Sequence, residues 1–355
     1  MKKIITVKTK DRNCNILIEN NSIISSVNDH LKNDERVFLI IDIKLSNLIK
    51  KIKINNKTHV IKIIGSEKIK SIENYSKLIS KLLKFKVDRS STLIAIGGGT
   101  VGDLSGFVAS TVLRGIRFVL IPTTLLAQVD SSIGGKNGIN TIYGKNLIGT
   151  FWQPDKVIID PNVLKSLKKR EIKSGYAEIL KYAMIKNKKF YQWLLKNYCR
   201  ILNLEEKFII KAIIESIKIK SIFVEKDEKE NLINNSSRAM LNFGHTFGHA
   251  LEAMNNYNKK LTHGEAISIG MAFATKISSK INKVNKEEYS ELINHLKKIG
   301  LPFYDKRINS NKIYDLMLSD KKTTNNKINL ILLKEIGSAY FERGLNKKNI
   351  KNLLS

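Results

Sequence analysis

The residues with the clearest potential for chemistry are three histidines and one glutamate. His245, His249 and His263 make up half of the six histidines in this 355-residue chain. His245 and His249 lie four residues apart in the segment GHTFGHA, so a helix projects both side chains from one face. Glu178 lies in an otherwise apolar helical segment, SGYAEILKY. A carboxylate buried there needs a partner, because an unpaired buried charge is costly.

These side chains match the ligand types of a catalytic zinc site, in which two histidines and one carboxylate leave a position open for water or substrate. We interpret the neighbouring Gly244 and Gly248 as leaving room for a bound group beside the histidines. One histidine alone is more simply a satisfied core or cap residue, but the cluster favours a metal. The spacing does not say which two histidines bind the metal and which one acts as acid or base.

A second candidate site is the glycine turn, Gly97 to Asp103, with the sequence GGGTVGD. It follows an apolar strand and opens a helix. Glycines let the backbone approach a pyrophosphate, and the helix N-terminus supplies N–H groups and a favourable dipole. The turn therefore favours a dinucleotide, although its spacing differs from G-x-G-x-x-G. A tight strand–helix turn without a ligand is the alternative.

Polar residues follow two other expected strands. Thr123 and Thr124 lie at the carboxyl end of a strand, where ligands bind in open α/β sheets. Asp42, at the end of an earlier strand, is suited to accept a hydrogen bond from a ribose hydroxyl, and it is equally suited to cap a helix.

Several cations lie in glycine-rich or apolar contexts, where a charge is not simply solvated. Lys136 ends the segment DSSIGGK, and Lys145 and Asn146 lie in GKN. Lysines after glycines can reach phosphate oxygens as point charges. The further cations of this kind are Arg114, Lys181, Lys220, Arg238, Lys321 and Lys322. In a lysine-rich chain, each lysine alone is more simply a surface residue.

The elements that must position these residues divide the chain in two. Short apolar runs at 37–43, 59–64, 91–96 and 117–121 alternate with helical stretches, which predicts a parallel α/β layer. Longer helical periods follow, for example at 174–185, 207–226 and 265–281. Segments 231–237 and 321–328 are polar and loop-like. We expect an α/β domain over 1–160 and a mainly helical domain over 161–355.

Composition limits the classes of function. The net charge of +30 invites a nucleic-acid interpretation, but the lysines are spread along the whole chain together with many Ile and Asn residues. No zinc-finger, basic-zipper or RNA-binding signature accompanies them. The charge should still favour anionic small molecules. Two distant cysteines fit a reducing cytoplasm, and no apolar run predicts a membrane span or signal peptide.

Together these segments resemble the 3-dehydroquinate synthase family of the sugar phosphate cyclases. The resemblance keeps the family's order over about residues 37–335 and rests on GGGTVGDLSGFVAS, RGIRFVLIPTTLLAQVDSSIGGKNGIN, GKNLIGTFWQP, REIKSGYAEILKYA, LNFGHTFGHALE, THGEAISIGMA and SDKK. It implies a Rossmann-like N-terminal domain, a helical C-terminal domain and an active site in the cleft between them.

The resemblance also implies roles for individual residues. The metal, zinc or cobalt, is assigned to Glu178, His245 and His263. NAD contacts are assigned to Asp42, Glu67, Lys70, Gly98, Gly99, Thr100, Val101, Gly102, Asp103, Thr123, Thr124, Lys136, Lys145, Val163, Leu164, Lys165 and Ser166. Substrate contacts are assigned to Asp130, Lys136, Asn146, Lys181, Lys220, Arg238, Asn242, His249 and Lys321. Arg114 is expected to reach the substrate phosphate across a homodimer interface.

The implied reaction converts 3-deoxy-D-arabino-heptulosonate 7-phosphate to 3-dehydroquinate and phosphate in the shikimate pathway. It combines transient oxidation by NAD, β-elimination of phosphate, reduction and aldol ring closure. The alternatives are a cyclase whose product lacks a carboxylate, and a polyol dehydrogenase of related fold. Lys220, Arg238, Asn242 and His249 argue against the first alternative, and the GGK and GKN segments argue against the second.

The chain departs from the family pattern in three loops. Lys44 stands where the family usually has Asn, and Ser66 replaces the glycine of the Gly-Glu-x-x-Lys adenosine loop. Asn234 occupies the position of a hydroxyl-binding Glu four residues before Arg238. About four extra residues in this loop would make Glu230 the equivalent, and such changes in loop length cost little free energy.

Overall fold

A computed structural model describes residues 2–232, 234–255, 260–318 and 327–354. The chain forms two compact units, Met1–Leu167 and Lys168–Ser355. The division lies a few residues beyond the expected position 160, because the short helix η5 (Pro161–Ser166) stays with the first unit. Its Val163 packs against the core of that unit, and Leu164 is fully buried.

Within the described part of the first unit, seven strands form one sheet in the order β1-β2-β9-β6-β5-β3-β4. The strands are β1 (Lys2–Val7), β2 (Cys14–Glu19), β3 (Val37–Asp42), β4 (Thr58–Ile63), β5 (Thr92–Gly97), β6 (Arg117–Pro122) and β9 (Lys156–Ile159). Only the edge strand β1 runs antiparallel to its neighbour. The predicted strands β3 to β6 and the parallel sheet are confirmed.

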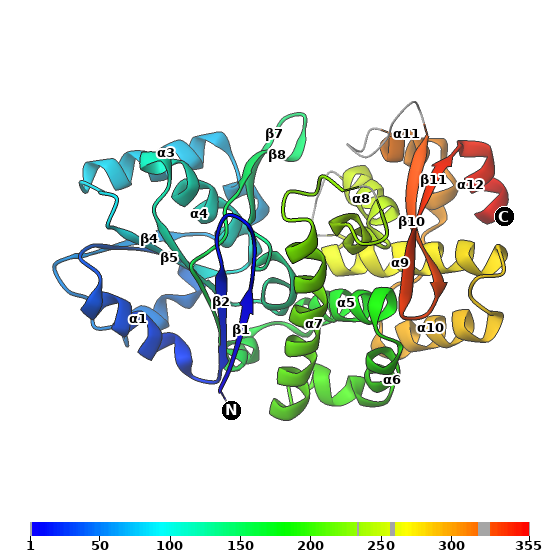
Figure 1. Ribbon diagram of the computed structural model, residues 1–355, viewed down its shortest axis with the longest axis horizontal. Coiled ribbons are helices and arrows are strands. Elements are labelled where there is room, and N and C mark those ends of the chain that lie inside the picture. The colour runs from blue at the N-terminus through cyan, green and yellow to red at the C-terminus, as the bar shows by residue number, and fades with distance from the viewer. Residues whose placement is uncertain (1, 233, 256–259, 319–326, 355) are drawn as a thin grey trace. The chain divides into compact units, whose positions relative to one another are not determined.

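Helices cover both faces of this sheet. The helices are α1 (Ser22–Asn33), α2 (Ser46–Ile49), α3 (Ile72–Lys84) and α4 (Gly99–Thr111), joined by short 3-10 turns η1 (Ile43–Leu45), η2 (Glu67–Ile69) and η3 (Val112–Arg114) and by η4 (Ala127–Ser131), which is a π-helix. Figure 1 shows α1 on one side of the sheet and α3 with α4 on the other.

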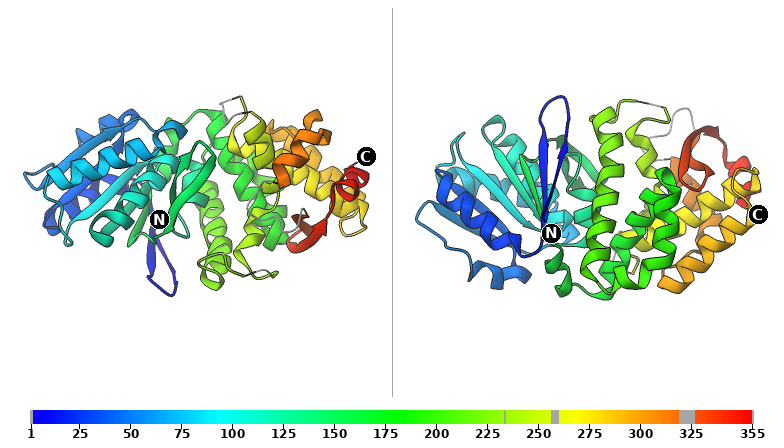
Figure 2. Two further views of the ribbon diagram at one scale, coloured as in Figure 1. Left: turned by 90° about the horizontal axis from the view of Figure 1, so that it is seen from above. Right: turned by 60° about the horizontal axis from the view of Figure 1, so that its bottom comes forward.

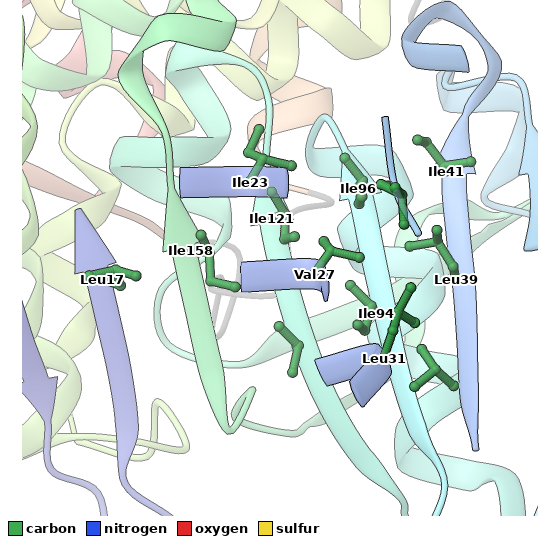
Figure 3. Packing of buried hydrophobic residues seen from close by; sticks show 13 residues of the cluster. Leu17, Ile23, Val27, Leu31, Leu39, Ile41, Ile94, Ile96, Ile121 and Ile158 are labelled. Carbon is green, nitrogen blue, oxygen red and sulfur yellow. The ribbon is translucent and has the colours of Figure 1, made fainter. Parts of the chain in front are cut away.

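Figure 3 shows how α1 packs against the sheet. Ile23, Val27 and Leu31 are spaced by four residues and therefore share one helical face. They meet strand residues that alternate with a period of two, among them Leu39 and Ile41 of β3. The remaining labelled members of this core are Leu17, Ile94, Ile96, Ile121 and Ile158. This apolar layer fixes the strands that carry the glycine turn.

The strand order reverses between β3 and β5, since β4 lies on one side of β3 and the later strands lie on the other. Ligands bind at the carboxyl ends of strands at such a reversal. Asp42 ends β3, Gly97 ends β5, and Thr123 follows β6. The backbone N–H of Thr123 donates to the carbonyl of Gly97 (2.9 Å), which holds two of these strand ends together.

A separate antiparallel hairpin, β7 (Lys136–Thr141) and β8 (Gly144–Phe151), follows η4. The apolar and polar pattern of the sequence does not predict it. Its tip is apolar but exposed, with Ile142 92% and Tyr143 86% accessible. Sequence patterns detect strands whose apolar side chains point into a core, and the apolar residues at this tip do not.

The second unit is mainly helical, as predicted (Figure 2). Its helices are α5 (Lys169–Lys186), α6 (Lys188–Leu202), α7 (Glu206–Lys226), α8 (His245–Met254), α9 (His263–Lys280), α10 (Lys286–Ile299), α11 (Asn311–Leu318) and α12 (Lys347–Leu354), with the 3-10 turns η6 (Arg238–Asn242) and η7 (Lys306–Asn309). A hairpin of β10 (Ile328–Glu335) and β11 (Ser338–Leu345) packs on α9 and α5. The three predicted helices are α5, α7 and α9.

Among the described residues, no helix combines the length and apolar character needed to cross a membrane. Most of the expected loop at 321–328 lies outside the described residues.

Candidate functional site

Helices α5, α8 and α9 bring Glu178, His245 and His263 together within the second unit. Glu178 is fully buried, and its Oε1 lies 3.6 Å from His245 Nε2 and 3.2 Å from His263 Nε2. The three candidate ligand atoms all lie within 4.8 Å of one another. One carboxylate and two imidazoles directed at a common point are the donor set of a catalytic zinc or cobalt site, so these residues fit a divalent metal.

The beginning of α9 is fixed by hydrogen bonds that place His263 in its first turn. Thr262 and Glu265 form a capping box, in which each side chain accepts from the backbone N–H of the other. Arg170 of α5 then forms a two-pronged contact with the Glu265 carboxylate. The N–H of Gly264 donates to Ser174 Oγ (2.9 Å), one turn before Glu178. These contacts place His263 beside Glu178.

Gly244 and Gly248 do not make room for a bound group, so that interpretation was wrong. A Cβ on Gly248 would lie 2.8 Å from Ile267 Cδ1 and 3.1 Å from Ala266 O, and a Cβ on Gly270 would lie 1.9 Å from Gly244 O. These glycines let the backbones of α8 and α9 approach closely. The histidines of the two helices come together because the helices do.

Glu252 is a further candidate that the sequence reasoning missed. Its Oε2 lies 3.5 Å from Nδ1 of His263, the ring nitrogen that does not face Glu178. His245 is held in the same way, because its Nδ1 lies 3.1 Å from the carbonyl oxygen of Phe243. Metal-binding histidines commonly use their second nitrogen for such contacts. The available signal was spacing, since Glu252 follows His245 by seven residues and shares its helical face.

The structure also brings His249, Glu252 and His263 together as a second, overlapping group. The His245 and His249 rings meet edge to face, with centroids 5.1 Å apart. His249 therefore lies next to the Glu178 group, as expected for two histidines on one helical face, and not at a separate site.

Electrostatics differ sharply between the two histidines nearest Glu178. Burial lowers the pKa of His245 well below its ordinary value, and the nearby Lys181 ammonium lowers it further. Burial also acts to lower the pKa of His263, but the Glu252 and Glu178 carboxylates outweigh it and raise this pKa to about 10. Lys181, 1% exposed, forms an ion pair with Glu178 Oε2.

Two other predicted cations of this unit are buried. Lys220 on α7 is 5% exposed, and Arg238 at the start of η6 is 2% exposed. The guanidinium of Arg238 donates to the carbonyl of Glu228 (2.9 Å). The elements that carry these cations, α7 and η6, pack against each other and against α5. Lys321 and Lys322 lie outside the described residues.

The loop between α7 and η6 places Glu230 beside Asn242. Asn242 Nδ2 donates to Glu230 Oε1 at 3.4 Å. Asp227, at the end of α7, accepts from the backbone N–H groups of Asn231, Leu232 and Arg238, so the loop folds back on this carboxylate. The acidic end of this loop therefore lies beside η6.

In the first unit, the glycine turn forms the N-terminus of α4, with Gly98 as the cap and Gly99 as the first helical residue. A small pocket at this turn is lined by Gly97, Gly98, Gly99, Gly102, Asp103, Ser131, Ser132 and other residues. A Cβ on Gly98 would lie 3.2 Å from Thr124 Cγ2, and one on Gly99 would lie 2.8 Å from Ser131 Oγ. This glycine backbone at a helix N-terminus fits a pyrophosphate.

A polar network connects the segment after β4 to α4 and to the β7–β8 hairpin. Lys70, 3% exposed, donates from Nζ to Asp103 Oδ2 (2.7 Å) and to Asn146 Oδ1 (2.5 Å). Glu67 lies 3.9 Å from Lys70 Nζ and 4.0 Å from Lys145 Nζ. Burial raises the pKa of Asp103, and the Lys70 ammonium opposes this shift. Predicted cofactor and substrate residues thus share one network.

The other predicted residues of the first unit occupy varied positions. Asp42 caps η1 by accepting from the N–H of Lys44 (3.1 Å). Asp130 lies in η4, and its negative charge adds to the rise that burial causes in the pKa of Asp103. Lys136 is exposed at the start of β7. Arg114 is exposed beyond the end of α4, and 13 helical residues place it about 20 Å from the glycine turn of its own chain.

Comparisons with known proteins agree along the chain. A family model described as 3-dehydroquinate synthase N-terminal matches residues 60–174, and the corresponding C-terminal model matches 175–323. A 3-dehydroquinate synthase of Pelagibacter ubique is 45% identical over 363 residues, covering 99% of this chain and 97% of that protein. One from Dictyoglomus turgidum is 45% identical over 296 residues, covering 83% and 82%.

Solved structures show the same fold. A 2-deoxy-scyllo-inosose synthase in complex with carbaglucose-6-phosphate, NAD+ and Co2+ is 25% identical with a TM-score of 0.81, and 99% of each chain is covered. A 2-epi-5-epi-valiolone synthase of Streptomyces hygroscopicus with NAD+ and Zn2+ has a TM-score of 0.87 at 22% identity, covering 99% of this chain and 98% of that one. The matches of both family models and the identity to full-length relatives show that the chain belongs to the 3-dehydroquinate synthase family.

Proposed function

We propose that this protein converts 3-deoxy-D-arabino-heptulosonate 7-phosphate to 3-dehydroquinate and phosphate, as a lyase that depends on NAD and on zinc or cobalt. The observation that carries the proposal is the donor set of Glu178, His245 and His263, whose ligand atoms all lie within 4.8 Å. The names of the relatives and the ligands in the cyclase structure support the same activity. The reaction belongs to the shikimate pathway.

Different groups of residues would bind the metal, the cofactor and the substrate. Glu178, His245 and His263 would hold the metal, while the glycine turn and the Glu67–Lys70 segment would hold NAD. Bound there, the metal would supply Lewis-acid chemistry at a substrate hydroxyl, and NAD would supply reversible hydride transfer. His249 and Asn242 would bind the hydroxyl groups beside the metal, with Glu230 adjoining Asn242.

The two ends of the substrate would bind to different cations. Lys220 and Arg238 are buried and suit the carboxylate, because an arginine can bind both of its oxygens. Lys136, Asn146 and Lys321 suit the phosphate. When the C–O bond to phosphate breaks, positive charge already in place stabilises the charge that develops on the leaving group. Much of the catalysis is then positioning and electrostatics.

We further propose a homodimer in which Arg114 reaches the phosphate bound by the partner. Its exposed position beyond the end of α4 leaves the side chain accessible to another chain, which supports this proposal. A cytoplasmic location is also proposed, since Cys14 and Cys199 are free thiols.

Phosphate release tests the proposed function. Protein that has been stripped of metal and then resupplied with zinc and NAD should release phosphate from the heptulosonate phosphate and form 3-dehydroquinate, with no net production of NADH. Omitting the metal should abolish release. Failure of the complete mixture to release phosphate, with the circular dichroism of the folded protein intact, would rule out the proposal.

A further inference from the structure

Asn140, at the end of β7, connects two segments that the proposed function gives to different ligands. Its Nδ2 donates to Glu67 Oε1 at 2.8 Å, and its Oδ1 accepts from the backbone N–H of Asn146 at 3.1 Å. Its own backbone N–H donates to the carbonyl of Lys70 at 2.8 Å. One residue therefore joins the proposed cofactor segment, Glu67–Lys70, to the turn that presents Asn146.

The side chain of Asn146 is held from the same side. Lys70 Nζ donates to Asn146 Oδ1 and to Asp103 Oδ2, and Lys70 is only 3% exposed. A charged hydrogen bond in so buried a position has a well-defined direction. Both the backbone and the side chain of Asn146 are therefore fixed by residues that contact, or belong to, the proposed cofactor segment.

The conformation of Asn146 makes it dependent on these contacts. Its φ is +52°, in the left-handed region that residues other than glycine rarely occupy. Asparagine tolerates this region better than most residues, but the surrounding structure must still favour it. The hydrogen bond from the Asn146 N–H to Asn140 supplies such support.

The Glu67 carboxylate contacts residues of both segments. Its Oε1 accepts from Asn140 and also lies 3.9 Å from Lys70 Nζ and 4.0 Å from Lys145 Nζ. A ligand that holds the Glu67 carboxylate in one position also restricts the side-chain amide of Asn140, which donates to that carboxylate. The oxygen of the same amide accepts from the Asn146 N–H, so the restriction extends to the backbone of Asn146.

We propose that Asn140 is a positioning residue that couples the two ligands, so that NAD bound at the Glu67–Lys70 segment strengthens binding of the substrate phosphate at Asn146. This inference rests on the proposed function. Coupling between two binding sites is reciprocal, so the sugar phosphate must strengthen NAD binding by the same factor. One or two hydrogen bonds lost with the Asn140 side chain would change that factor roughly tenfold.

Amide hydrogen exchange of the full-length, metal-loaded protein, measured with and without NAD, tests the coupling without relying on turnover. In the wild type, NAD should slow exchange both at residues 98–103 and at the turn 144–148. In Asn140→Ala, NAD should still slow exchange at 98–103, but its effect at 144–148 should fall below about twofold. An Asn140→Ala protein that keeps the wild-type effect at 144–148 would overturn the inference.

Two further variants separate the role of Asn140 from general damage to the hairpin. Asn140→Asp keeps an acceptor for the Asn146 N–H but sets a second carboxylate against Glu67, so it should lose the coupling while folding normally. Thr141→Val removes only hydrogen bonds within the hairpin turn and should keep the coupling. Equal loss in Thr141→Val would show that any weakened hairpin has the same effect and would overturn the inference.

Steady-state kinetics provides a second readout. At saturating NAD, Asn140→Ala should raise KM for the sugar phosphate roughly tenfold and leave kcat within about threefold, because the residue acts on binding. A fall in kcat with unchanged KM would contradict this. If wild-type exchange responds to NAD at 98–103 only, the coupling alone fails. If it responds nowhere, the proposed NAD site fails and the inference fails with it.

Discussion

His245 and His249 occupy one face of α8 but meet different surroundings. Nε2 of His245 faces the buried Glu178 carboxylate, and its Nδ1 lies near a backbone carbonyl. His249 lies beside the His245 ring and belongs to the second group, with Glu252 and His263. The sequence identifies both histidines but cannot separate them, because residues four apart on a helix are equivalent until the neighbouring helices are placed.

Replacement of each histidine tests this separation. His245→Ala removes one of the three proposed ligands and should lose the metal, as measured by zinc content after dialysis. His249→Ala should retain zinc near one equivalent, and kcat should fall by roughly 100-fold, because the hydroxyl groups beside the metal lose a contact that positions them. Equal loss of zinc in both variants would mean that the roles are assigned to the wrong face.

Glu252 provides a second prediction at this scale. Glu252→Gln removes the negative charge beside His263 Nδ1 and should weaken zinc binding by roughly 10- to 100-fold, measured by competition with a chelator. Glu215→Gln is the charge-matched control, because it removes one carboxylate from the exposed Glu215–Lys218 pair of α7, which is not one of the three helices that carry Glu178, His245 and His263. Zinc affinity within about twofold of the wild type in both variants would show that Glu252 does not orient His263.

Whole elements are predicted well where the apolar pattern is strong. Strands β3 to β6 and helices α5, α7 and α9 follow directly from continuous apolar runs or from apolar residues with a period near 2 or 3.6. The hairpins β7–β8 and β10–β11 do not, since their stability comes from pairing and from contacts distant in sequence. The sequence also does not predict the close packing of α8 on α9. Glycines allow two backbones to approach, but the sequence does not show which backbone lies against a given glycine.

A buried histidine–tyrosine pair between two helices predicts how the stability of the protein depends on pH. His295 of α10 contacts Tyr176 of α5 through Nε2 and the hydroxyl (2.9 Å), and the Tyr198 ring of α6 meets it edge-on. Burial, with a smaller effect of Lys298, lowers the pKa of His295 to about 4. The unfolded chain therefore takes up a proton as pH falls below about 6.5 while the folded protein does not, and stability is lost between pH 6.5 and 4.

Urea unfolding of His295→Gln at pH 7.5 and pH 5 checks this. Glutamine can keep a hydrogen bond to Tyr176 but does not titrate. Between the two pH values the wild type should lose roughly 2 kcal/mol more unfolding free energy than the variant. Parallel losses in the two proteins would show that His295 does not titrate as its surroundings indicate.

At the scale of the whole molecule, the sequence predicts a parallel α/β layer followed by a helical region, but not the contacts between elements that bring the candidate residues together. Glu178, His245 and His263 come together across 85 residues of chain separation only because α5, α8 and α9 pack together. Glu252 is marked in the sequence only by its spacing of seven residues from His245, and Asn140 has no feature that marks it, since the contacts of both are made by residues on other elements. Pairing of this kind depends on three-dimensional structure that local patterns do not contain.

The proposed action of Arg114 on the partner subunit predicts complementation. Arg114→Ala and His245→Ala should each be nearly inactive as homodimers. In a mixed dimer, the Arg114→Ala subunit keeps its own metal and receives Arg114 from the other chain, so one complete site forms. Co-expression should restore roughly a quarter of wild-type activity, because about half of randomly assembled dimers are mixed. If co-expression gives no more activity than the two separate variants, Arg114 contacts either the substrate bound to its own chain or no substrate.

The buried cations Lys220 and Arg238 are proposed to make this protein specific for a sugar phosphate that carries a carboxylate. The direct measurement compares kcat/KM for the heptulosonate phosphate and for the same sugar phosphate with a hydroxymethyl group in place of the carboxylate. A site whose buried polar groups lose their partner discriminates strongly, so the ratio should be about 1,000 or more in favour of the carboxylate. A ratio below about ten would contradict the claim and favour a cyclase that makes a ring without a carboxylate.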